Sequence, residues 1–120
     1  MTFCHVPLIN QYIKLNKTNE QKEIIMTKKI TLKLIDNQSH AYIQISKYDL
    51  EGLNIDIKDI GSQYSFYNEN NACYYLEQDC DANKLHTQLR LKGYEIFDYK
   101  VNHVALNYMN DPIFKRLSNV

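Results

Sequence analysis

The chain has 120 residues, of which 44% are hydrophobic and 23% are charged, with three glycines and two prolines. This composition is typical of one folded globular domain and excludes a disordered or fibrous chain. No apolar run approaches the roughly 18 residues that a membrane-spanning helix needs. The first residues also lack a secretory pattern, so we expect a cytoplasmic protein with no membrane partner.

Fourteen basic and fourteen acidic residues cancel, yet the two signs are unevenly distributed. Residues 36–81 carry nine carboxylates and two lysines, whereas residues 82–120 carry six basic and three acidic side chains. Because an acidic middle repels a phosphate backbone, we expect no nucleic-acid binding. The three cysteines include no Cys-x-x-Cys pair, which favours reduced thiols over a disulfide framework.

Residues 1–25 differ from the rest of the chain, because their apolar residues show no clear period. Gln21–Ile25 can also be encoded by a sequence that looks like a bacterial ribosome-binding site ahead of Met26. One hypothesis is that the natural protein starts at Met26 and that residues 1–25 are a poorly ordered, mis-annotated extension. The alternative is a flexible or helical extension. Under both hypotheses residues 26–120 form a single α+β domain.

A β-hairpin is predicted next, because apolar and polar residues alternate over 28–35 and again over 41–45, with a polar turn between them. Ser46 is expected to cap a helix of one or two turns that ends at Gly52. Residues 63–67 are predicted to form a third strand, followed by an asparagine-rich turn. Spaced apolar residues before that strand indicate a packed connection: Leu53, Ile55, Ile57 and Ile60.

The clearest signal in the sequence is a strand that runs into the principal helix. Residues 72–77 have strand-forming composition, and either Asp79 or Asp81 can offer a carboxylate to the free amides of a first helical turn. Gly93 is expected to end the helix. Apolar residues recur at intervals of about one helical turn and should form the face that packs on the sheet: Ala82, Leu85 and Leu89.

The remainder is predicted to form strands and a last helix. Residues 94–101 are predicted to form a strand. Apolar and polar residues alternate again over 104–108, so the sequence fits either one strand or two in this region. Asn110–Pro112 has the sequence of a helix start. The fold class is therefore α+β, with a small antiparallel sheet of about four to six strands, one principal helix on one face and short accessory helices.

Glu77, Asp79 and Asp81 are the densest group of carboxylates, and hard cations prefer such oxygen ligands. The group lacks the glycine and the distal glutamate of a calcium loop, and helix capping explains two of the three, so no metal site is predicted. An activated thiolate at Cys80 is not expected, because two aspartates flank it. We predict no catalytic residue and no cofactor. One further set matches no standard zinc spacing: Cys73, Cys80, His86 and His103.

Ten tyrosines and no tryptophan are the most unusual feature of the composition. Aromatic residues on a sheet stack bases in some RNA-binding modules, but the basic rim of such modules is missing near the predicted strands. Tyrosine is enriched at protein interfaces. We therefore predict a protein-binding surface at the strand-to-helix junction, formed by Tyr75, Glu77, Asp79 and Asp81.

The segment Tyr75-Leu76-Glu77-Gln78-Asp79-Cys80-Asp81-Ala82 resembles an uncharacterised family of short bacterial, plasmid and phage proteins, in which a Tyr-Leu-Glu strand end runs into an Asp-Cys-Asp helix start. The likeness covers about residues 40–120 and leaves residues 1–25 outside. Gln78 stands where the family is expected to have an acidic residue. The resemblance implies no activity, only a small accessory protein encoded on a mobile element.

Two functional hypotheses follow. The favoured one is a non-enzymatic interaction protein that contacts an unidentified protein partner through its acidic, tyrosine-rich junction. The alternative is a small metal-binding protein or enzyme that uses Glu77, Asp79, Cys80, Asp81 and His86.

Overall fold

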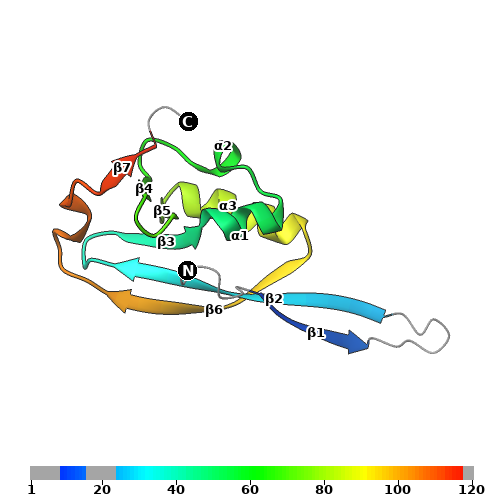
Figure 1. Ribbon diagram of the computed structural model, residues 1–120. Coiled ribbons are helices and arrows are strands. Elements are labelled where there is room, and N and C mark those ends of the chain that lie inside the picture. The colour runs from blue at the N-terminus through cyan, green and yellow to red at the C-terminus, as the bar shows by residue number, and fades with distance from the viewer. Residues whose placement is uncertain (1–8, 16–23, 118–120) are drawn as a thin grey trace.

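The computed structural model describes residues 9–15 and 24–117. It has an α+β fold in which the helices pack against one mixed sheet (Figure 1). The strands are β1 (Ile9–Leu15), β2 (Ile24–Asp36), β3 (Ala41–Ser46), β4 (Phe66–Asn68), β5 (Cys73–Glu77), β6 (Tyr94–His103) and β7 (Phe114–Arg116). The helices are α1 (Lys47–Leu53), α2 (Ile57–Ile60), α3 (Asp81–Leu91) and the short 3₁₀ helix η2 (Tyr108–Asn110).

The described strands lie in the order β1-β2-β3-β5-β4-β7, and β6 pairs with β2. Neighbours are antiparallel except β2 and β6, which run parallel. The predicted α+β class is confirmed, although the sheet is mixed rather than purely antiparallel. The parallel pair arises because α3 carries the chain from β5 across the sheet to β2, the kind of long crossover that parallel strands require.

The structure confirms the predicted hairpin, the predicted Ser46 cap and the predicted helix end at Gly93. β2 and β3 form the predicted hairpin. The hydroxyl of Ser46 accepts a hydrogen bond from the amide of Asp49 at 2.9 Å and so caps α1. The helix ends one residue later than predicted, because Asn54, with a φ of 59°, takes the left-handed conformation that stops it. At the end of α3, Gly93 has a φ of 89° and acts as predicted.

Two apolar clusters lie on opposite faces of the sheet, because neighbouring residues of a strand point to opposite sides. The helix-side core includes Leu32, Ile43 and Leu76 from the strands, together with the predicted face of α3: Ala82, Leu85 and Leu89. The second core lies on the other face, where the segment after β6 covers it. It contains Ile35, Tyr42, Phe66, Cys73, Tyr75, Met109 and Phe114.

The C-terminal segment differs from the prediction in two places. Residues 104–108 form no strand, and the chain turns there and enters η2. Residues 114–116, predicted within a helix, pair with β4 as β7. The signal at Asn110–Pro112 specifies a single turn, since the carbonyl of Asp111 accepts a hydrogen bond from the amide of Phe114 at 3.0 Å. Pairing with β4 then buries Phe114 without a helix.

Part of the predicted N-terminal extension takes part in the sheet. Residues 9–15 form β1, which pairs with Ile24–Ile30 of β2. Residues 1–8 and 16–23 lie outside the described residues, and a natural start at Met26 stays a prediction. No helix in the described ranges is long and apolar enough to cross a membrane.

Candidate functional site

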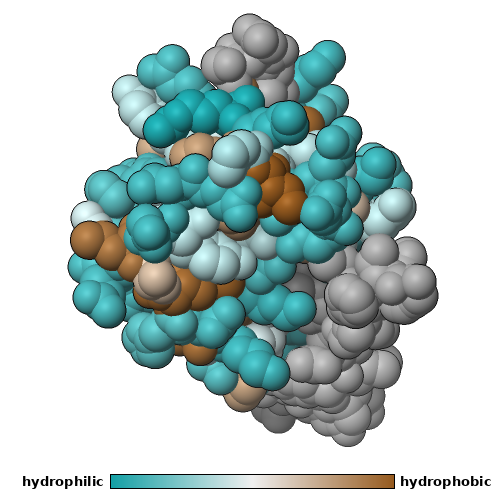
Figure 2. All heavy atoms as spheres, turned by 60° about the vertical axis from the view of Figure 1, so that its left-hand side comes forward, coloured by the Kyte–Doolittle hydropathy of each residue, from teal (hydrophilic) through white to brown (hydrophobic). Residues whose placement is uncertain are grey.

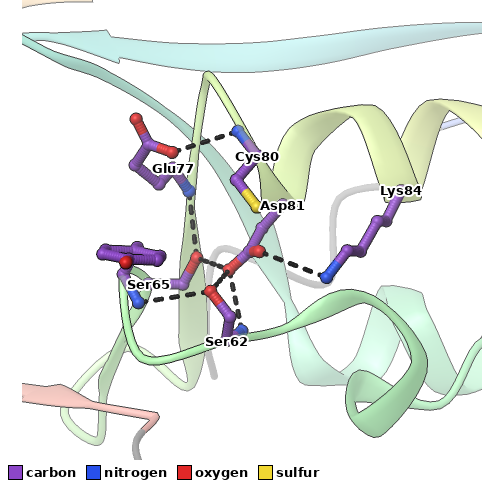
Figure 3. Close-up of polar contacts among 7 residues, drawn as sticks. Ser62, Ser65, Glu77, Cys80, Asp81 and Lys84 are labelled. Atoms are coloured by element: carbon purple, nitrogen blue, oxygen red, sulfur yellow. Dashed lines mark hydrogen bonds and ion pairs between the residues drawn. The ribbon is translucent and has the colours of Figure 1, made fainter.

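The junction between β5 and α3 is held by a buried carboxylate (Figure 3). Asp81 is fully buried at the first position of α3. Its Oδ2 atom accepts hydrogen bonds from the amide and the hydroxyl of Ser62, both at 2.8 Å, and from the hydroxyl of Ser65. The Ser65 oxygen accepts the amide proton of Glu77 at 3.0 Å. Asp81 therefore ties the loop before β4 to the start of α3.

The second carboxylate oxygen of Asp81 is less well satisfied. Oδ1 accepts no hydrogen bond from a described residue, and the Nζ atom of Lys84 lies 3.9 Å away (Figure 3). A buried carboxylate is unstable unless charges and donors compensate it. Here three donors to Oδ2, the Lys84 ammonium and the positive end of the α3 dipole provide that compensation.

Neither predicted aspartate caps α3, so that prediction was wrong. The helix begins after Cys80, and the amide of Cys80 donates to Oε1 of Glu77 at 3.1 Å. Asp79 is exposed and makes no hydrogen bond or ion pair with a described residue. Asp81 is engaged by Ser62 and Ser65, which lie 19 and 16 residues earlier. Spacing along the sequence identifies local partners only, and these two are distant.

A cleft of about 380 Å³ opens beside this network, and we call it the junction cleft. The segments that line it are far apart in the sequence and meet at one end of the sheet. They are β3 and the turn before it, the loop before β4, the end of β5 with the β5–α3 connection, and β7. The lining residues are His40, Tyr42, Tyr64, Glu77, Asp79, Cys80 and Arg116.

Charge in the junction cleft is mixed. Burial raises the pKa of Tyr42, the Glu77 carboxylate raises it further, and the Arg116 guanidinium opposes both. Arg116 is held in place, because its Nη1 atom donates to the carbonyl of Gln63 at 2.9 Å and its guanidinium lies 4.7 Å from the centre of the Phe66 ring. The junction cleft therefore combines one positioned cation with the carboxylates of Glu77 and Asp79.

A second cleft of about 470 Å³ adjoins the junction cleft and shares three lining residues with it, namely His40, Tyr42 and Arg116. The rest of its lining is apolar or uncharged: Asn37, Ser39, Phe66, Leu106, Met109, Asn110 and Phe114. Figure 2 brings this end of the molecule forward and shows hydrophobic patches within a mostly hydrophilic surface. The two clefts thus share the side formed by His40, Tyr42 and Arg116, and the carboxylates of Glu77 and Asp79 line the junction cleft alone.

The structure separates the four residues predicted to form a binding surface. Glu77 and Asp79 line the junction cleft. Tyr75 is buried in the second core, where its ring packs edge-on against Phe114 with ring centres 5.1 Å apart. Asp81 is buried as well. Burial removes Tyr75 and Asp81 from any surface that a partner contacts, because the strand alternation and the serine contacts turn them inward.

The residues of the alternative, chemical hypothesis do not converge. The Nε2 atom of His86 lies 3.1 Å from the hydroxyl of Tyr99 on β6, and burial together with Arg90 lowers the pKa of His86. Asp81 is engaged by the serines instead. Within the described part of the chain, no three His, Cys, Asp or Glu side chains are arranged to hold a metal ion.

Comparisons with protein-family models, with curated proteins and with solved structures find no match to this chain. The resemblance noted at the strand-to-helix junction therefore stays a prediction.

Proposed function

We propose that the protein is a non-enzymatic interaction protein that binds a segment of a partner protein in the junction cleft. The observation that carries this proposal is the convergence of tyrosine rings, carboxylates and a fixed guanidinium in one open cleft. Aromatic and arginine side chains are enriched where proteins bind one another. Cys73 and Cys80 form no disulfide with each other, and reduced cysteines support a cytoplasmic setting for this binding.

The lining favours a partner segment that carries a basic side chain. The carboxylate of Asp79 makes no described contact, and Glu77 uses only Oε1, on the amide of Cys80. Both can accept charge-assisted hydrogen bonds from lysine or arginine. Tyr64 is 53% exposed and offers its ring to the same cation. A neighbouring apolar side chain of the partner would enter the adjoining cleft, near Leu106.

The contacts at the junction favour binding over catalysis. Ser65 donates to a carboxylate, but it is fully buried, so a substrate does not reach its hydroxyl. The Ser62 hydroxyl donates to Asp81 as well, and its oxygen accepts the amide of Tyr64 at 3.2 Å. The Cys80 thiol has no base within hydrogen-bonding distance among the described residues, and nucleophilic catalysis requires one.

Selection from a library of random peptides tests this proposal without knowledge of the partner. We expect the protein to enrich peptides that carry a lysine or arginine beside an apolar residue. Asp79→Lys and Tyr64→Ser should each abolish binding of those peptides. Glu69→Lys is the matched control, since it makes the same charge change at an exposed position in the β4–β5 turn. Thermal unfolding of each variant checks that the fold is intact.

Two results would contradict the proposal. One is a selection that enriches no peptide above background. The other is enriched peptides that bind folded Asp79→Lys and Tyr64→Ser as tightly as the unchanged protein, which would place binding at another surface.

A further inference from the structure

The strand β6 lies at the margin of the sheet (Figure 1). It has ten residues and pairs with β2, and no other described strand pairs with it. The amide of Val104 donates to the carbonyl of Asp36 at the end of β2, at 2.9 Å. Because backbone groups alternate in direction along a strand, those of Tyr99, Val101 and His103 point away from β2.

A side-chain contact confirms this direction independently. The amide of Tyr99 donates at 2.8 Å to Oδ1 of its neighbour Asp98, in an exposed contact, rather than to β2. The same strand exposes apolar side chains, with Phe97 58% exposed, Tyr99 38% and Val101 46%. A long edge with outward backbone groups and exposed apolar side chains is a template for a further strand.

Charge along β6 fits a second copy of the same strand. In a two-fold symmetric antiparallel pair, one residue lies opposite its own copy. A pair centred on Asp98 opposes two carboxylates, and a pair centred on Lys100 opposes two ammonium groups, so both destabilise the pair. A pair centred on Val101 leaves Asp98 opposite Val104. Only a pair centred on Tyr99 places Asp98 opposite Lys100, and it does so twice.

We propose that β6 pairs with β6 of a second copy of this chain, antiparallel and centred on Tyr99, so that the two sheets become continuous. The amide of each Tyr99 would exchange the Asp98 carboxylate for the carbonyl of Tyr99 of the partner subunit. The released Asp98 carboxylate then pairs with Lys100 of the partner subunit. Both side chains lie on one face, because Asp98 pairs with Thr31 and Lys100 with Lys33 across β2.

The same register relieves a repulsion within one copy. Lys33 and Lys100 are neighbours on β2 and β6, both are exposed, and neither forms an ion pair with a described residue. Like charges in directly opposed positions destabilise a sheet. Asp98 of the partner subunit would lie beside Lys100 on its free side and compensate the two lysines. This contact leaves the junction cleft open, since none of the residues lining that cleft belongs to β6.

Sedimentation velocity of the full chain tests the proposal, with charge reversal as the probe. The unchanged protein should be a dimer. Asp98→Lys and Lys100→Asp should each raise the dimer dissociation constant about tenfold or more, because each opposes like charges across the pair. The double variant Asp98→Lys/Lys100→Asp should restore the dimer. Glu69→Lys is the control for net charge and should remain dimeric, and circular dichroism checks the fold of every variant.

Three results would overturn the proposal. The first is an unchanged protein that sediments as a monomer at all concentrations. The second is a dimer that both folded single variants preserve, which would locate the interface elsewhere. The third is a folded double variant that stays monomeric, because the register requires the two charges to compensate each other.

Discussion

The helices α1 and α3 begin in different ways. At α1, the hydroxyl of Ser46 accepts the amide of Asp49, three residues along the chain. At α3, the carboxylate of Asp81 faces Ser62 and Ser65, which belong to a loop 19 and 16 residues away. The first start is complete within one turn, whereas the second exists only after the loop has folded onto the helix. A polar residue at a helix start can therefore act as a local cap or as a long-range anchor.

Asp81→Ala removes the long-range contact at the start of α3 and should have the largest effect on stability. The substitution leaves one buried donor, the Ser65 hydroxyl, and two partly buried donors of Ser62 without their acceptor, so we expect a loss of about 3 to 5 kcal/mol in the free energy of unfolding. Urea denaturation measures it. Asp81→Asn is the matched variant and should lose less, because it keeps one oxygen acceptor. Equal midpoints for Asp81→Ala and the unchanged protein would show that the network is not formed.

Truncation of the buried face of each helix should show that the two helices differ at their starts and not in their packing. Leu85 in α3 and Leu50 in α1 are both buried in the helix-side core. Changing either to Ala should cost about 2 to 5 kcal/mol, through lost burial and a residual cavity. Thermal and urea unfolding are the measurements. A negligible loss for Leu85→Ala would mean that the face of α3 is misassigned.

Ser46→Ala probes the local start and should have a smaller effect. Loss of the acceptor for the amide of Asp49 is expected to cost about 0.5 to 2 kcal/mol. Ser46→Thr keeps a hydroxyl acceptor without burying a charge and serves as the control, since threonine also caps helices. If Ser46→Ala cost more than Asp81→Ala in the same urea titration, the ranking of the two starts would be reversed.

Asp79→Ala should have the smallest effect on stability. Asp79 is exposed and caps no helix, so we expect a change within about 0.5 kcal/mol, as for most surface substitutions. Differential scanning calorimetry is sensitive enough to detect a larger change. A loss like that of Ser46→Ala would restore the capping role that the sequence suggested for Asp79. Peptide binding, in contrast, should be lost in this variant because the carboxylate lines the junction cleft.

The same division between local and distant contacts explains how much of the fold the sequence predicts. The hairpin, the Ser46 cap and the buried face of α3 depend on alternation or spacing within a few residues, and all three are confirmed. The parallel pairing of β6 with β2 and the antiparallel pairing of β7 with β4 join segments that are distant in the sequence. No local pattern encodes such pairing, so neither was predicted.

The candidate site divides in the same way. Glu77 and Asp79 could be assigned to it because they lie directly at the predicted strand-to-helix junction. Sheet pairing is what brings three other residues to the junction cleft: His40, Tyr42 and Arg116. Arg116 reaches it because it belongs to β7, which pairs with β4. The alternation along β5 predicts that Tyr75 and Glu77 lie on the same face of the sheet, which is the face of the second core. It does not predict that the Tyr75 ring is buried and the Glu77 carboxylate only half-buried, because that depends on the segments that cover this face.

The long-range anchor at α3 is tested most directly by a double-mutant cycle of Asp81→Ala and Ser65→Ala, measured by urea denaturation. Ser65 donates to Asp81 and lies 16 residues before it. If the two side chains act as one unit, the double variant should lose less than the sum of the single losses, with a coupling energy of about 1 to 3 kcal/mol. Losses that add to within about 0.5 kcal/mol would contradict the anchor, because independent sites show no more coupling than that.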